Sequence, residues 1–324
     1  MVILASEVIG TITWNLSAKM SLADEHDYFL LDKINIEINR WTEFLFNILS
    51  VIYGLGYVAR IRELLECGTK ESISYAAELM NLEGSELIPK LISLFDIASD
   101  KEKLDNLIHY FPGEIFNHRN LREDMINRDY NLISIWTKAC VLRSIDKIES
   151  KEMAESVAAL LFSPEEIIQE ESANLIGRSN PEIYLSVSGR IPGSISKRVN
   201  EIINGNADRK GFLYEKIKLL SIYFKGIAED DLLPLAKGMI YFTNTNAGPI
   251  VHYKGYILWI SSSQKEYFTV HVLYGAEGEN LTEVCRNNQN AYIYLLPLIT
   301  IEDYHFQFPD KSYKILQFID DNER

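Results

Sequence analysis

The stretch Leu219–Ser263, LLSIYFKGIAEDDLLPLAKGMIYFTNTNAGPIVHYKGYILWISSS, marks where the chain changes its type of secondary structure. Its first half has the apolar spacing of helices, and its second half has short aromatic and β-branched runs that are typical of strands. Strand-like alternation is nearly absent before residue 240. The sequence therefore predicts a multidomain α+β chain, in which a helical part precedes a small antiparallel β part closed by helices.

The composition describes an acidic globular protein. Its 324 residues include 32 Lys and Arg against 46 Asp and Glu, which gives a formal charge of −14. Such a surface repels DNA, RNA and anionic lipid unless a basic patch is set apart from it. The segment that comes nearest, Arg190–Arg198, carries only three cations. We therefore expect no nucleic-acid partner.

The cysteines and the apolar runs indicate a cytoplasmic location. Cys67, Cys140 and Cys285 lie far apart, and no CxxC motif occurs, so we expect reduced thiols. The opening residues lack the basic start of a signal peptide. The best candidate for a membrane span, Phe44–Ala59, is shorter than the roughly 20 residues that a span needs. A core helix is favoured there, and any membrane contact would run through a partner or a missing N-terminal segment.

The clearest helix is predicted over Asp24 to Tyr53, and several shorter ones follow. Three segments pair helices in a loosely repeated way, with Ala139, Cys140 and Ala173 as small residues that allow close approach; they are Glu86–Glu102, Leu121–Ile145 and Ala154–Pro181. They resemble HEAT-type repeats, which implies an α-solenoid similar to armadillo and HEAT proteins. An irregular helical domain is the alternative.

The polar, glycine-bounded segment Gly205–Gly211 predicts a boundary between a helical domain at 1–206 and a β domain at 207–324. Five strand-like runs follow, and two helices, at 299–308 and 310–321, close the chain. The runs are Met239–Thr243, Pro249–Tyr253, Tyr256–Ser261, Tyr267–Tyr274 and Ala291–Leu296.

Residues from about 212 to 320 resemble the cyclic-nucleotide-binding fold, a jelly-roll-like β-roll flanked by helices. The likeness rests on Phe224–Ile227 at a helix end, on the leucines of the next helix, on the strand Ile257–Ile260 and on Ile299–Asp303. In that family a Gly-Glu pair and a following Arg hold the ribose and the cyclic phosphate.

The resemblance carries over three ligand-binding candidates: Gly278, Glu279 and Arg286. Asn287 and Asn288 follow the arginine where the family has a small residue and Ala. Arg286 is also the only Lys or Arg between Glu266 and Asp310. A roll that has lost cyclic-nucleotide binding is therefore expected, and no cofactor is implied.

Helical hairpins followed by such a roll are similar to the soluble region of bacterial carriers related to ATP/ADP translocases. Residues 128–145 and 157–191 are the matching segments. This resemblance implies a cytoplasmic module whose partner is a protein or a transporter domain.

Motifs that would carry chemistry are missing from the sequence. The six histidines occur singly, and neither a nucleophile elbow nor a P-loop is present. Glu229–Asp231 is interpreted as a helix start rather than a metal cluster. We therefore predict a non-catalytic regulatory or protein-interaction module. A sensor of a small effector, such as one that regulates a membrane carrier, is the alternative. A hydrolase using His109 or His118 is a third class.

Overall fold

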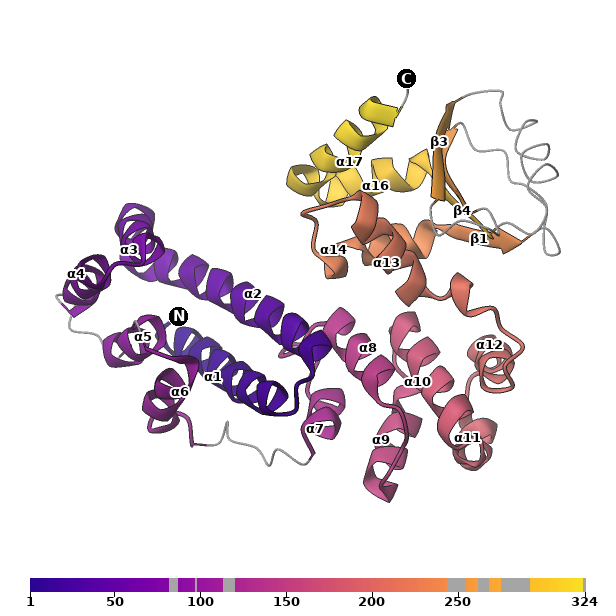
Figure 1. Cartoon of the computed structure of the whole chain (residues 1–324), viewed down its shortest axis with the longest axis horizontal. Coiled ribbons are helices and arrows are strands. Elements are labelled where there is room, and N and C mark those ends of the chain that lie inside the picture. The colour runs from indigo at the N-terminus through magenta and orange to yellow at the C-terminus, as the bar shows by residue number, and fades with distance from the viewer. Residues whose placement is uncertain are drawn as a thin grey trace. The chain divides into compact units, whose positions relative to one another are not determined.

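The computed structural model describes residues 1–81, 87–96, 98–112, 120–243, 255–261, 268–274 and 292–322. The chain divides into two compact units, Met1–Ile145 and Asp146–Arg324, which we describe separately. The described part is mostly helical, with a small antiparallel sheet near the C-terminus (Figure 1). This agrees with the predicted α+β class.

The division between the units differs from the boundary predicted at residues 206/207. The helix α10 (Glu166–Ser179) lies on the N-terminal side of that predicted boundary, and α13 (Leu213–Tyr223) lies on the other side. The two helices pack together, and Glu170 of α10 accepts a hydrogen bond from the backbone N–H of Leu213 at 2.8 Å. The segment at 205–211 therefore connects helices of one unit.

Unit 1 is organised around two long helices that pack side by side, α1 (Val2–Asp24) and α2 (Tyr28–Tyr53) (Figure 1). Sequence reasoning predicted one helix from Asp24, but α2 begins at Tyr28, because Asp27 caps it by accepting the N–H of Leu30 at 3.1 Å. It ends at Gly54, whose φ of 93° suits glycine. Helix α1 was not predicted, since its middle is buried on all sides and shows no amphipathic stripe.

Shorter helices complete unit 1 around a core drawn mainly from α1 and α2. They are α3 (Leu55–Cys67), α4 (Lys70–Asn81), α5 (Ile88–Phe95), α6 (Asp100–Ile108), α7 (Leu121–Asn127) and α8 (Ile135–Ser144). The apolar run at 44–59 is thus split between α2 and α3. Along the described helices, none is both long enough and apolar enough to cross a membrane.

Unit 2 begins with helices centred on α10, which is buried from Ile167 through Ile176 except at Gln169. Around it lie α9 (Lys151–Leu160), α11 (Glu182–Val187) and α12 (Gly193–Ile203). The predicted small residues Ala139, Cys140 and Ala173 are fully buried in their respective units. Helix pairs α5–α6, α7–α8 and α9–α10 pack at the three predicted segments; their regularity as repeats stays a prediction.

The sheet of unit 2 has the strand order β1-β4-β2-β3, and all its pairs are antiparallel. The strands are β1 (Ile240–Thr243), β2 (Gly255–Ser261), β3 (Phe268–Tyr274) and β4 (Tyr292–Pro297). They match four of the five predicted runs; the run Pro249–Tyr253 lies outside the described residues.

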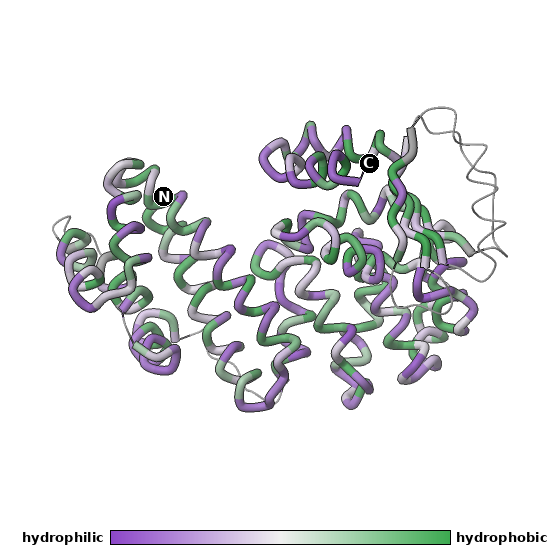
Figure 2. The backbone as a smooth tube through the Cα atoms, turned by 45° about the horizontal axis from the view of Figure 1, so that its top comes forward, coloured by the Kyte–Doolittle hydropathy of each residue, from purple (hydrophilic) through white to green (hydrophobic). Residues whose placement is uncertain are grey.

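Helices α13, α14 (Glu229–Gly238), α16 (Leu298–Gln307) and α17 (Pro309–Asn322) gather on one side of the sheet (Figure 1). The last two confirm the predicted closing helices. Trp259 of β2 is fully buried. The ring of Phe224 meets it edge-on at 6.2 Å between ring centres, and the tilted ring of Tyr223 lies 5.9 Å away. Figure 2 shows the strands as largely hydrophobic, whereas α17 alternates hydrophilic and hydrophobic turns.

Candidate functional site

A polar pocket of about 360 Å³ opens in unit 2 where α10, α12, α13 and β1 meet. This volume lies at the lower end of the range of roughly 300–1,000 Å³ that is usual for small-molecule sites. Charged and polar side chains dominate its wall, which is lined by Glu166, Arg198, Glu201, Asn206, Ala207, Asp208, Gly211, Phe212, Lys216 and Tyr241. We call it the polar pocket.

An ion pair between the buried Glu170 and the half-exposed Arg198 fixes one side of the polar pocket. Glu170 is 1% exposed and accepts hydrogen bonds from the guanidinium of Arg198 and from the N–H of Leu213. Burial raises the pKa of Glu170 above its usual range, although Arg198 acts in the opposite direction. Burial also disfavours the charge on Arg198, but the attraction of Glu170 and Glu166 outweighs it and raises its pKa. The pair therefore holds Arg198 in one place.

Lys216 approaches the polar pocket from α13, one turn beyond the start of that helix. Its Nζ donates a hydrogen bond to the backbone oxygen of Met239 at 2.6 Å. Burial lowers the pKa of Lys216, and the nearby carboxylate of Glu170 compensates only in part. The ammonium of Lys216 is therefore already hydrogen-bonded within the protein.

Tyr241 lines the polar pocket from β1, and Tyr294 packs against its ring. The hydroxyl of Tyr241 donates to Asp208, whose other carboxylate oxygen accepts the N–H of Lys210 at 3.0 Å. The ring of Tyr294 lies 5.0 Å from that of Tyr241, and its hydroxyl donates to the backbone oxygen of Lys210 at 2.9 Å. Burial raises the pKa of both phenols, so both remain protonated at neutral pH.

Two polar side chains of the wall are held in place by the protein. Tyr241 is held protonated by Asp208, and Lys216 is held by Met239. The pocket can therefore offer fixed hydrogen-bonding and charged groups to a ligand.

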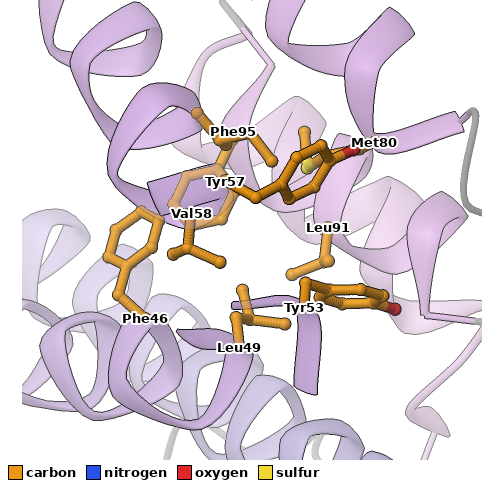
Figure 3. A pocket seen from close by; sticks show the side chains of 9 residues that line it. Phe46, Leu49, Tyr53, Tyr57, Val58, Met80, Leu91 and Phe95 are labelled. Carbon is orange, nitrogen blue, oxygen red and sulfur yellow. The ribbon is translucent and has the colours of Figure 1, made fainter. Parts of the chain in front are cut away.

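A second pocket, in unit 1, is lined only by apolar and aromatic side chains (Figure 3). Phe46, Leu49, Val58, Leu91 and Phe95 point toward one another around a volume of about 10 Å³. This is about the size needed for a single water molecule. It is a gap in the core rather than a ligand site.

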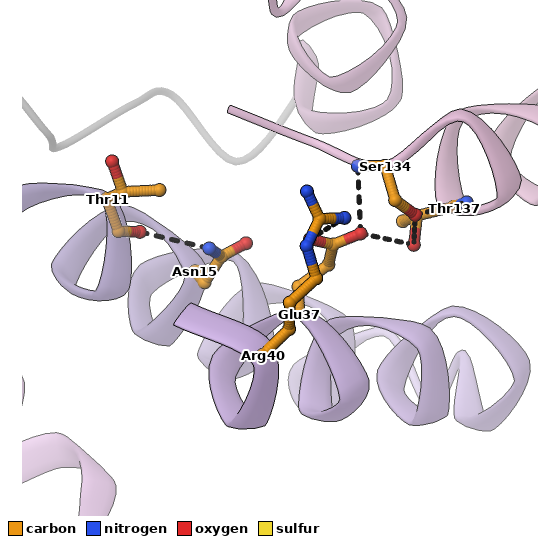
Figure 4. Close-up of polar contacts among 6 residues, drawn as sticks. All are labelled: Thr11, Asn15, Glu37, Arg40, Ser134 and Thr137. Atoms are coloured by element: carbon orange, nitrogen blue, oxygen red, sulfur yellow. Dashed lines mark hydrogen bonds and ion pairs between the residues drawn. The ribbon is translucent and has the colours of Figure 1, made fainter. Parts of the chain in front are cut away.

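A buried polar cluster in unit 1 joins α2 to the start of α8 (Figure 4). Glu37 is 1% exposed and accepts the hydroxyl of Thr137 at 2.7 Å and the N–H of Ser134 at 2.9 Å. Arg40 lies 3.7 Å from its other oxygen. Because Ser134 caps α8, this cluster satisfies a helix end and has a structural role.

The candidates predicted from the cyclic-nucleotide-binding resemblance, Gly278, Glu279 and Arg286, lie outside the described residues, as does His118. His109 ends α6. The run Glu229–Asp231 occupies the first turn of α14, as predicted. Within the described ranges, no cluster of His, Cys, Asp and Glu is arranged to hold a metal.

Sequence reasoning missed the polar pocket because its residues are spread from position 166 to 241 and share no motif. Two signals were present. Arg198 lies in the segment noted as the nearest to a basic patch, and Asp208 lies in the polar segment interpreted as a domain boundary. Neither signal by itself indicates that these residues and α10 line one pocket.

Comparisons of the chain with protein-family models, with curated proteins and with solved structures gave no match in any of the three.

Proposed function

We propose that the chain is a non-catalytic binding module whose second unit holds a small polar effector in the polar pocket. The observation that carries this proposal is the open pocket of about 360 Å³, together with the ion pair between Arg198 and the buried Glu170 that fixes its wall. Preformed pockets with a few fixed polar groups are the usual form of small-molecule sites.

Thermal unfolding of the full chain tests this proposal. A ligand that binds the folded state raises the melting temperature, by an amount that grows with its concentration. A set of small polar compounds covering cations, neutral molecules and anions, cyclic nucleotides included, would be compared on the wild type and on Ala207→Phe. The larger side chain of this variant fills the polar pocket from its lining.

The expected result is that one class of compound stabilises the wild type by several degrees and leaves Ala207→Phe unchanged. If every compound acts equally on the two proteins, the polar pocket is not a binding site.

The architecture expected from the sequence belongs to the same proposal. HEAT-like helical repeats would form the scaffold, and a cyclic-nucleotide-binding-like roll would surround the sheet. The whole would act in the cytoplasm as a regulatory module, in contact with a protein partner or a transporter domain. The packed helix pairs and the antiparallel sheet support this interpretation.

A protein partner is the second candidate, favoured by a groove of about 380 Å³ in unit 1. Helices α3, α4 and α5 line it with Ile73, Ala77 and Ile92, and Lys70 and Asp96 add charge. A groove of this kind fits the apolar face of an amphipathic helix.

Crosslinking with the wild type and with Ala77→Glu tests this candidate. A carboxylate in the groove should remove the captured partner while the helical circular dichroism is unchanged. A partner captured equally by both proteins would exclude the groove.

A further inference from the structure

We propose that the ligand of the polar pocket is a small organic cation, carrying an ammonium or a guanidinium group. This inference rests on the proposed function above and specifies its ligand class. Three features carry it: the balance of charge around the pocket, the commitment of both its cationic residues to protein partners, and an aromatic wall.

Carboxylates outnumber cations in this region. Among the residues that line the pocket, the carboxylates are Glu166, Glu201 and Asp208, and the cations are Arg198 and Lys216. Arg198 is paired with the buried Glu170 behind them. Opposite charges attract over several ångströms when part of the surroundings is protein rather than water. The local field therefore favours a positive ligand and disfavours a phosphate or a carboxylate.

Both cations already have partners within the protein. Arg198 binds Glu170, and its Nε lies 3.6 Å from Glu166. Lys216 donates to Met239 from a buried position. An anion would have to compete with these internal partners. If it displaced Glu170 from Arg198, the buried carboxylate of Glu170 would be left without its cation.

Glu201 is exposed near the end of α12 and attracts Arg198 electrostatically. Its carboxylate forms neither a hydrogen bond nor a close ion pair with another described residue. Asn206 lines the same pocket with an amide, and Tyr241 lines it with a ring. A carboxylate, an amide oxygen and an aromatic ring are all groups that attract an ammonium or a guanidinium.

The cation is organic rather than metallic. A divalent metal needs several oxygen ligands at 2.0–2.6 Å from one point. Within the described residues, the carboxylates of the pocket do not converge in that way. An organic cation tolerates separated carboxylates, because its donors are spread along its length, and its apolar portion can contact Phe212 and Tyr241.

Isothermal titration of the full chain with agmatine tests this inference, since agmatine has a guanidinium at one end and an ammonium at the other. Succinate and 1,4-butanediol serve as anionic and neutral probes of similar length. The key variant is Glu201→Gln, whose exposed carboxylate can be replaced without loss of folding. The matched control is Glu155→Gln, which changes the net charge by the same amount. Glu155 is exposed on α9, where it pairs with Lys151.

We expect agmatine to bind the wild type and the other two probes not to bind. Compared with the wild type, Glu201→Gln should bind agmatine about fivefold more weakly, and Glu155→Gln should bind it with unchanged affinity. Equal weakening in both variants would mean attraction to the acidic surface as a whole and would overturn the assignment. The absence of agmatine binding would overturn it as well.

Binding of succinate or butanediol that Ala207→Phe abolishes would keep the proposed function and exclude the cation. If no probe and no compound of the wider set distinguishes the wild type from Ala207→Phe, the proposed function fails too.

Discussion

Glu37 on α2 accepts the backbone N–H of Ser134, the capping residue of α8, at 2.9 Å across 97 residues of sequence. The same carboxylate oxygen accepts the hydroxyl of Thr137 at 2.7 Å. Both helices belong to unit 1. The carboxylate of Glu37 lies at the N-terminal end of α8, where the helix dipole favours negative charge. This contact connects the first helices of the unit to its last one (Figure 4).

Replacement of Glu37 by Ala should lower the free energy of unfolding by about 3 kcal/mol, because a buried N–H and hydroxyl lose their acceptor. Glu37→Gln keeps one acceptor oxygen and should cost about 1 kcal/mol. Urea unfolding followed by tryptophan fluorescence measures both, since Trp14, Trp41 and Trp136 lie in unit 1. Glu63→Ala, in an exposed pair with Arg60, is the control. Equal losses in Glu37→Ala and Glu63→Ala would contradict a structural role for the cluster.

Gly177→Ala should destabilise the protein, although the same change normally stabilises a helix interior. A Cβ at this position of α10 would lie 2.8 Å from the backbone oxygen of Ile203 on α12. Backbone atoms cannot move aside without separating the two helices, so we expect a loss of about 2 kcal/mol. Thermal unfolding measures it. Gly56→Ala in α3 is the comparison, since its Cβ would meet open space, and it should not destabilise. A stable Gly177→Ala would mean that α10 and α12 are less closely packed than described.

The stability of unit 1 should depend on Lys138 in alkaline solution. Burial lowers the pKa of Lys138 to about 8. Between about pH 8 and the ordinary value of 10.5, the unfolded chain binds a proton that the folded protein has released. The free energy of unfolding therefore rises with pH in this window, by about 1 kcal/mol after allowance for solvent screening.

The measurement is urea unfolding of the wild type and of Lys138→Met at pH 7.5, 9 and 10.5, expressed as the difference between the two proteins. Other lysines and tyrosines titrate in both proteins and cancel in that difference. A difference that is constant over this range would mean that the ammonium is solvated in the folded state.

Several of the 18 tyrosines should resist ionisation in the folded protein. Burial raises the pKa of Tyr241 and Tyr294 far above 10, and that of Tyr304 to about 12. At pH 11 the absorbance of phenolate near 295 nm should thus be lower in the folded than in the unfolded protein. The folded state keeps protons that the unfolded chain releases, so stability falls as the pH rises past about 10.

Tyr241→Phe should reduce the difference in phenolate absorbance between the unfolded and the folded protein by the contribution of one tyrosine. Tyr28→Phe, at a side chain that is 71% exposed, should leave this difference unchanged. Circular dichroism at pH 11 confirms that the protein is still folded. An unchanged difference in Tyr241→Phe would contradict the contact between Tyr241 and Asp208.

Local patterns in the sequence were sufficient for much of the secondary structure. Apolar spacing located α2, and aromatic and β-branched runs located β2 and β3, because each of these signals depends on neighbours a few residues away. The predicted helix end at Tyr53 is also local, since the next residue, Gly54, adopts a positive φ that favours glycine. Helix α1 was not predicted, because a helix that is buried on all sides has no polar face to set against its apolar face.

The site, in contrast, depends on which helices pack together. Glu170, Arg198 and Leu213 are far apart in the chain and have no shared spacing. They meet only because α10 packs against both α12 and α13. Residue type and local spacing thus determined the helices, the strands and the acidic charge of this protein. The polar pocket was decided by tertiary structure alone, because burial and long-range packing, rather than any local preference, bring its charges together.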